Sequence, residues 1–232
     1  MSSSLDGVDS RVEPGHDEGS RDILDLDRLR AAPLVRDPFD FVIVEEFLRR
    51  EALMPLAADF PDIRRHGSYP VDTLAYGPAF ARLVAALTGT ELRHAIEEKF
   101  GIDLSDRPTL LTVRGRSDDK DGRIHTDTKS KIITILIYMN AGWEHPGGRL
   151  RLLRSADDLD DLILEAPPVE GTLLAFKRAD NSWHGHKPFA GERRVIQFNW
   201  VTSEGDRRMA MLRHHVSAPL KRLFAAMRPS AA

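Results

Sequence analysis

Three side chains with metal-binding chemistry stand out in the sequence: His125, Asp127 and His184. His125 and Asp127 form an H-x-D triplet. On an extended strand, residues i and i+2 point to the same face, so this imidazole and this carboxylate can converge on one ion. A histidine from a distant strand would complete the two-histidine, one-carboxylate set that binds non-haem Fe(II) and leaves coordination positions open. H-x-D alone is common by chance, so the triplet needs support from other motifs.

A basic residue on the last long predicted strand gives that support. Arg194 follows His184 by ten positions. 2-Oxoglutarate chelates iron through one end and leaves a free carboxylate at the other. A planar guanidinium matches a carboxylate with two parallel hydrogen bonds, so an arginine is the expected partner. The neighbouring Arg193 would point to the opposite face of the strand and is the alternative anchor.

The composition excludes several kinds of partner and several kinds of metal site. The chain has 232 residues, 33 basic and 36 acidic side chains, and no cysteine. Because basic and acidic side chains nearly balance, the chain has no excess of positive charge that would attract nucleic acid or an anionic membrane. Because it has no cysteine, thiolate metal sites and disulfides are excluded. No signal peptide and no apolar run of about 18 residues is visible. We therefore expect a cytoplasmic protein without nucleic-acid or membrane partners.

The order of the predicted elements indicates an α+β fold. Residues 1–20 are polar and predict a flexible tail, and residues 21–107 predict a strand near Phe41 and helices over 49–60 and 77–101, with Gly101 as a C-cap. Residues 108–202 contain many short strands separated by turns, which favours a jelly-roll-like double sheet. Residues 203–232 predict a C-terminal helical extension. We expect the N-terminal helices to pack on one sheet of the jelly roll.

Five elements in a fixed order extend the metal motif. The sequence over 108–202 resembles the prolyl 4-hydroxylase-like branch of the 2-oxoglutarate/Fe(II)-dependent dioxygenase superfamily. The resemblance rests on the H-x-D triplet, residues 137–140 (IYMN), residues 147–150 (GGRL), residues 168–176 (PVEGTLLAF), and the run from His184 through Pro188 to Arg194 and Trp200. The family pattern places its basic anchor six residues before a tryptophan on the same face, which Arg194 and Trp200 satisfy.

The resemblance implies a double-stranded β-helix core and an oxygenase that uses Fe(II), 2-oxoglutarate and O₂, with ascorbate as an assay additive. It makes His125, Asp127 and His184 the iron ligands, Arg194 the partner of the 2-oxoglutarate C5-carboxylate, and Tyr138 a second contact to it. The expected reaction is hydroxylation of a C–H bond with release of succinate and CO₂. Asp127 argues against halogenation, because related halogenases lack this carboxylate.

Several alternatives stay open at this point. The substrate can be a small molecule or a peptide residue. His186 is a candidate hydrogen-bonding residue near the metal, and Lys129 or Lys131 is an alternative co-substrate contact. The C-terminal helix either packs on its own domain or forms a homodimer. The rival classes are a cupin-like metal protein that does not use 2-oxoglutarate and a non-catalytic interaction domain.

Overall fold

The computed structural model describes residues 22–212. The predicted tail of residues 1–20 and most of the extension over 203–232, including its proposed dimer contact, lie outside this range. The elements in chain order are α2 (Leu26–Ala31), β1 (Phe41–Val44), α3 (Arg50–Ala58), β2 (Tyr69–Pro70), η1 (Val71–Thr73), α4 (Pro78–Thr88), α5 (Thr90–Phe100), β3 (Thr109–Ser117), β4 (Lys131–Tyr138), β5 (Leu150–Leu153), β6 (Leu162–Ala166), β7 (Leu173–Lys177), β8 (His184–Gly185) and β9 (Gly191–Val201).

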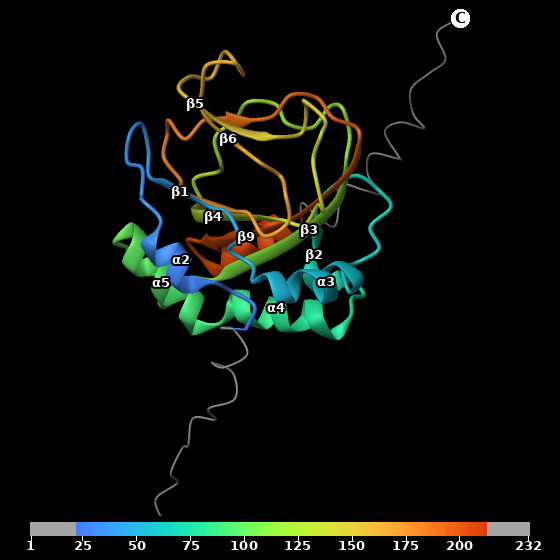
Figure 1. Cartoon of the computed structure of the whole chain (residues 1–232). Coiled ribbons are helices and arrows are strands. Elements are labelled where there is room, and N and C mark those ends of the chain that lie inside the picture. Colours follow the sequence, from blue (N-terminus) through green and yellow to red (C-terminus); the bar gives the residue numbers. More distant parts are fainter. Residues whose placement is uncertain (1–21, 213–232) are drawn as a thin grey trace, which may run out of the picture.

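The strands form two sheets whose strand pairs are antiparallel. The larger sheet has six strands in the order β1-β7-β4-β9-β3-β2, and the smaller sheet has three in the order β6-β5-β8. Figure 1 shows the smaller sheet above the larger one, with the helices on the far side of the larger sheet. The described residues therefore form three layers: helices, large sheet and small sheet.

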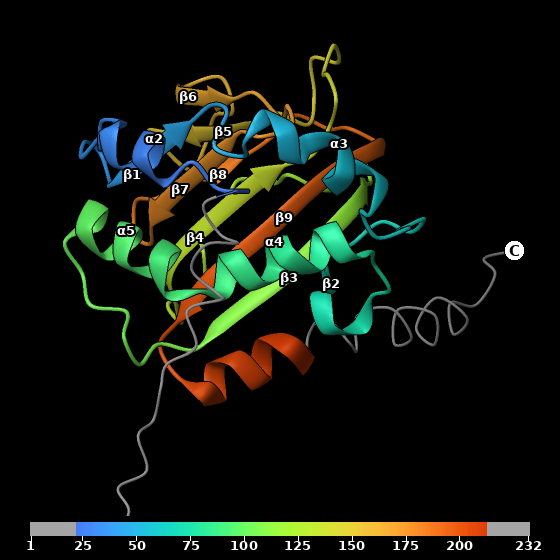
Figure 2. The same ribbon diagram turned by 60° about the horizontal axis from the view of Figure 1, so that its bottom comes forward.

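The two faces of the large sheet bury different side chains. On the helix side, Leu83 of α4 and Ile96 of α5 share a core with Ile135 of β4 and with Phe198 and Trp200 of β9. Figure 2 shows α4 lying across β4, β9 and β3, with α5 beside it toward β7. On the opposite face, a second cluster joins the two sheets; it contains Leu136, Tyr138, Leu174, Phe176 and Val195 from the large sheet and Leu150, Leu152 and Ala166 from the small sheet.

The helical region differs from the prediction at one glycine. A single helical stretch was expected over 77–101, but Gly89 adopts an extended conformation (φ −75°, ψ 166°) and separates α4 from α5. The chain therefore forms two separate helices, both of which share a core with the large sheet. Gly101 ends α5 in the left-handed conformation (φ 63°, ψ 45°), which confirms the predicted C-cap.

A last helical segment begins at residue 204 and is described up to residue 212. Figure 2 shows it beside the β3 edge of the large sheet. Met209 and Leu212 of this segment are exposed. Within residues 22–212, no helix is long and apolar enough to cross a membrane.

Candidate active site

The two histidines of the metal motif are direct neighbours across two chain segments. His125 donates its backbone N–H to the carbonyl of His184 (3.0 Å), and His184 donates to the carbonyl of His125 (2.9 Å). This antiparallel bridge places the imidazole rings 4.3 Å apart, centroid to centroid. The H-x-D triplet lies in an extended segment with this single bridge rather than in a long strand. The bridge therefore does the positioning that a strand was expected to do.

The hydrogen bonds of the imidazoles leave one nitrogen free on each ring. Nδ1 of His125 lies 2.8 Å from the carbonyl oxygen of Arg123, and Nδ1 of His184 lies 2.9 Å from that of Ser182. A carbonyl oxygen only accepts, so Nδ1 is the donor in both rings, and Nε2 of the neutral ring carries a lone pair. Burial lowers the pKa of His184 to about 4, so this ring is neutral at pH 7. Both rings are thus prepared to bind a metal through Nε2.

The carboxylate of Asp127 is held by two side chains. Lys131 donates to Oδ1 (2.6 Å), and Thr134 of β4 donates to Oδ2 (2.5 Å). Burial raises the pKa of Asp127, but the Lys131 ammonium, His184 and these hydrogen bonds outweigh it and hold the pKa below its usual value. Ligand atoms of His125, Asp127 and His184 all lie within 4.8 Å of one another. Two imidazoles and one carboxylate in this arrangement fit a single Fe(II) ion.

The three residues open into a cavity of about 580 Å³ between the two sheets. Its wall on the large sheet consists of alternate residues of β3, β4 and β9, because side chains of one parity face the cavity and those of the other parity face the helices. The alternating wall residues are Leu110, Thr112, Arg114, Thr134, Leu136, Arg193, Val195, Gln197 and Asn199, and Lys131 of β4 and Phe176 of β7 also line the cavity from the large sheet. A cavity of this size suits a small molecule.

Arg193 forms the basic end of this wall. Its side chain is buried (5% exposed) and donates through Nε to the carbonyl of Gly148 (2.8 Å). It makes no salt bridge with any carboxylate of residues 22–212, and its guanidinium lies 5.6 Å from the ring centroid of Tyr138. A buried cation is normally paired, so this one requires an anion from outside the described protein atoms.

Tyr138 lies beside Arg193 on the same side of the large sheet. Its hydroxyl is buried and has no hydrogen-bond partner among the described residues. Burial raises the pKa of Tyr138, with the Arg193 charge opposing, so at pH 7 the hydroxyl is a neutral donor. Arg193, which lines the cavity, and Tyr138, which lies behind the lining, interact with each other, and neither has a carboxylate partner among the described residues.

Arg194, the preferred anchor from the sequence, points to the other face of β9. Its guanidinium pairs with Glu192 (2.7 Å) and lies 5.3 Å from the ring centroid of Phe60, and it does not line the cavity. Arg194 and Trp200 do share a face, as predicted, but that face is covered by the helices. The structure thus separates Arg194 from the predicted metal ligands, and the alternative, Arg193, lies in the cavity with them.

Three further cavity residues were not assigned from the sequence or were left open. His186 lines the cavity, and its Nδ1 donates to the carbonyl of Lys187 (2.9 Å). Burial lowers the pKa of His186 to about 4, with the Arg193 charge adding to the effect. Gln197 and Asn199 were missed. The alternation of side chains along β9 could have identified them. Ile196, Phe198 and Trp200 point to one face of the strand, and the two amides point to the other.

The comparisons with known proteins agree with this geometry. A family model described as the 2OG-Fe(II) oxygenase superfamily matches residues 114–202. A prolyl 4-hydroxylase from Pseudomonas putida superposes with a TM-score of 0.50 at 20% identity, covering 84% of this chain and all of that one. HygX from Streptomyces hygroscopicus, solved with nickel and 2-oxoglutarate, gives a TM-score of 0.50 at 12% identity over 71% of this chain and 82% of its own. No curated protein sequence matches this chain.

The superfamily match runs from the middle of β3 to the end of β9, and so contains His125, Asp127, His184 and most of the residues that line the cavity. The match favours 2-oxoglutarate chemistry over the cupin-like and non-catalytic alternatives, and the solved structures show a shared fold. Residues 114–202 belong to the 2OG-Fe(II) oxygenase superfamily, and the chain is a 2-oxoglutarate-dependent dioxygenase whose fold is similar to that of a prolyl 4-hydroxylase.

Proposed function

We propose that the chain hydroxylates a C–H bond of its substrate, with Fe(II) bound by His125, Asp127 and His184 and 2-oxoglutarate anchored by Arg193. The two sheets are interpreted as the double-stranded β-helix that carries this centre. When bound, Fe(II) and 2-oxoglutarate supply the oxidising chemistry: O₂ and 2-oxoglutarate are consumed, one oxygen atom enters the C–H bond, and succinate and CO₂ leave.

The observation that carries this proposal is the unpaired Arg193. A dicarboxylate that chelates a metal at the His-Asp-His cluster needs a cation for its second carboxylate, and Arg193 is a buried cation in the same cavity without a carboxylate partner among the described residues. Tyr138 adds a neutral hydroxyl donor with no other partner. Charge-assisted hydrogen bonds of this kind are about twice as strong as neutral ones.

Groups that contact the proposed metal ligands fix their protonation and orientation. Arg123 and Ser182 fix the tautomers of the two histidines through their carbonyls, and Lys131 and Thr134 keep the Asp127 carboxylate ionised and oriented. Such outer contacts raise metal affinity by fixing ligand orientation. Phe176, whose ring lies 4.9 Å from that of His184, gives the cavity an apolar wall that restricts water.

The test is a comparison of Arg193→Met with Arg194→Met in an assay for 2-oxoglutarate binding to the iron-loaded protein without oxygen. Loss of binding in Arg193→Met alone supports the proposal. Loss in Arg194→Met alone would return the anchor to the opposite face of β9 and contradict the proposed pocket.

A further inference from the structure

The cavity has a surplus of positive charge that the proposed co-substrate does not neutralise. Five basic side chains and three acidic ones line it: Arg114, Lys120, Arg123, Lys131 and Arg193 against Asp121, Asp127 and Asp206. Fe(II) and the 2-oxoglutarate dianion cancel each other, so loading leaves the surplus in place. Arg114 is already paired with Asp121, whereas Lys120 and Arg123 form no described salt bridge. A cavity lined by one sign of charge concentrates ligands of the opposite sign.

Lys131 is the cation of this set that lies against the proposed metal site. Its ammonium contacts Oδ1 of Asp127 and its side chain is 18% exposed. A metal ion on Asp127 would compete with Lys131 for the negative charge of this carboxylate. Lys131 would then be a partly buried ammonium in need of a second anion, and it already lines the cavity from which one could come.

Two amides of β9, Gln197 and Asn199, line the same cavity as Lys131. Asn199 of β9 is opposite Thr134 of β4, and Gln197 is opposite Leu136. Directly opposite residues in an antiparallel pair have Cβ atoms about 4.5–5.5 Å apart. Asn199 is therefore the neighbour of the residue that holds Asp127, which places its amide next to the metal ligands rather than at the Arg193 end.

The amide of Asn199 has a donor that is not used. Gln197 donates through Nε2 to Oδ1 of Asn199 (3.3 Å), while Nδ2 of Asn199 is buried and has no partner among the described residues. Asn199 is 2% exposed and lines the cavity. A buried donor without a partner costs about 1–3 kcal/mol. The side chain would recover this energy by turning its amide to an acceptor oxygen in the cavity.

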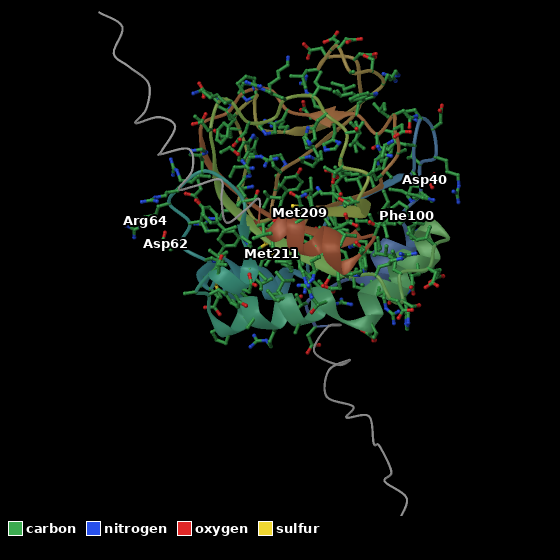
Figure 3. The ribbon with its side chains drawn as sticks, turned by 180° about the vertical axis from the view of Figure 1, so that it is seen from behind. Asp40, Asp62, Arg64, Phe100, Met209 and Met211 are labelled. Atoms are coloured by element: carbon green, nitrogen blue, oxygen red, sulfur yellow. The ribbon has the colours of Figure 1, made fainter. Side chains whose placement is uncertain are left out.

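The size of the cavity favours a small ligand. Asp206, Met209 and Ala210 of the last helical segment line it. Figure 3 labels Met209 on this segment, which crosses the front of that view. This segment therefore encloses the same cavity as residues of β3 and β9, and the cavity volume of about 580 Å³ suits a small molecule.

We propose that the substrate is a small molecule with a carboxylate group, and that Lys131 and the amides of Asn199 and Gln197 bind this carboxylate beside the iron. This inference rests on the proposed function, because it assigns the 2-oxoglutarate carboxylate to Arg193. Lys131 and Asn199 are specificity-determining residues in this account, and their donors select carboxylates over the neutral amides and amines of the same skeleton.

The test uses the full chain loaded with Fe(II) and saturating 2-oxoglutarate without oxygen, so that the Arg193 site is filled. Free amino acids and short-chain carboxylic acids are titrated by calorimetry, each beside its primary amide. We expect saturable binding of at least one carboxylate and binding at least about tenfold weaker for its amide. Asn199→Leu and Lys131→Met should each weaken carboxylate binding about tenfold or more. The matched controls, Asn181→Leu and Lys129→Met, are exposed positions outside the cavity and should not.

The outcomes separate the two proposals. If the visible charge-transfer band of the iron–2-oxoglutarate chelate does not form in the parent protein, the proposed function fails and this inference fails with it. If the band forms and no carboxylate binds, or amides bind equally well, only the carboxylate site is wrong. Binding of a peptide without a free carboxylate would also overturn it. Because Lys131→Met removes a contact to Asp127, Asn199→Leu decides the matter if Lys131→Met no longer forms the band.

Discussion

His125 and His184 lie far apart in the sequence yet exchange both of their backbone hydrogen bonds, at 3.0 and 2.9 Å. The same pair of bonds fixes the distance between the two imidazoles, because residues directly opposite in an antiparallel bridge hold their side chains close together. The proposed metal site thus lies at the β-bridge between the segment of His125 and strand β8, and the hydrogen bond from the His186 N–H to the Gly122 carbonyl (2.9 Å) joins the same two segments.

Removing His125 should abolish metal binding while the fold remains. The side chain is exposed and makes one hydrogen bond, to the Arg123 carbonyl. We expect His125→Ala to lose Fe(II) binding and turnover, with the Tm of the metal-free protein shifted by less than about 5 °C. His94→Ala, an exposed change on α5, is the control and should bind iron normally. A Tm shift beyond about 15 °C would show that His125 supports the core instead.

The two arginines of β9 should differ in their effect on 2-oxoglutarate. Arg193→Met should weaken its binding at least about 30-fold, since truncating one partner of a buried charge pair costs about 2–5 kcal/mol. Arg194→Met should change it by no more than about twofold, because the side chain pairs with Glu192 on the helix side of β9. Without ligand, Arg193→Met should melt no lower than the parent, since it removes a buried charge without a described carboxylate partner. Equal losses in both variants would contradict the assignment.

Tyr138 gives a test in which stability and binding move in opposite directions. The hydroxyl is buried without a partner, so Tyr138→Phe should stabilise the ligand-free protein by about 1 kcal/mol and raise its Tm by roughly 2–4 °C. The same change should weaken 2-oxoglutarate binding about fivefold or more, through loss of one hydrogen bond to a charged group. A lower Tm in the ligand-free protein would mean that the hydroxyl is already satisfied within the fold.

Stability should fall as the pH is lowered from about 6.5 to 4. His184 and His186 each have a pKa near 4 in the folded protein against 6.5 as the ordinary value, mainly because of burial. Between these values the unfolded chain binds more protons than the folded one, so acid favours unfolding; above pH 6.5 the two groups no longer contribute a slope. Denaturant titrations of the metal-free protein at several pH values measure this slope. His186→Gln should reduce it, and an unchanged slope would show that His186 is protonated freely in the fold.

The structure brings the three predicted metal ligands together, whereas of the two arginines considered as the co-substrate anchor only Arg193 lines the same cavity; the reason for this difference is physical. Chemistry restricts a metal site to a few residue types, so His125, Asp127 and His184 were identifiable by type and order. Arg193 and Arg194 are the same type, and the choice between them depends on which face of β9 the helices cover. The alternation of side chains along β9 contained that information. Arg194 shares its face with large apolar residues, and Arg193 shares its face with the two amides.

Elsewhere in the fold, too, local sequence patterns predict some elements, whereas elements that depend on tertiary contacts are not predicted. The long β-branched runs over β4 and β9 and the cap at Gly101 are local signals, and the structure has elements at these places. The break at Gly89 and the two-residue strand β8, which pairs with β5, depend on tertiary packing and pairing rather than on a local pattern. Positions that tertiary contacts decide are the positions that the sequence leaves open.

The most direct test of the account is an anaerobic titration of the metal-free protein with Fe(II) and then 2-oxoglutarate, recorded in the visible range. We predict one Fe(II) per chain and a weak charge-transfer band that appears only when both are present and that Arg193→Met loses. Iron binding without the band would contradict the role of Arg193 and of 2-oxoglutarate. Failure to bind iron at all would contradict the His125–Asp127–His184 centre.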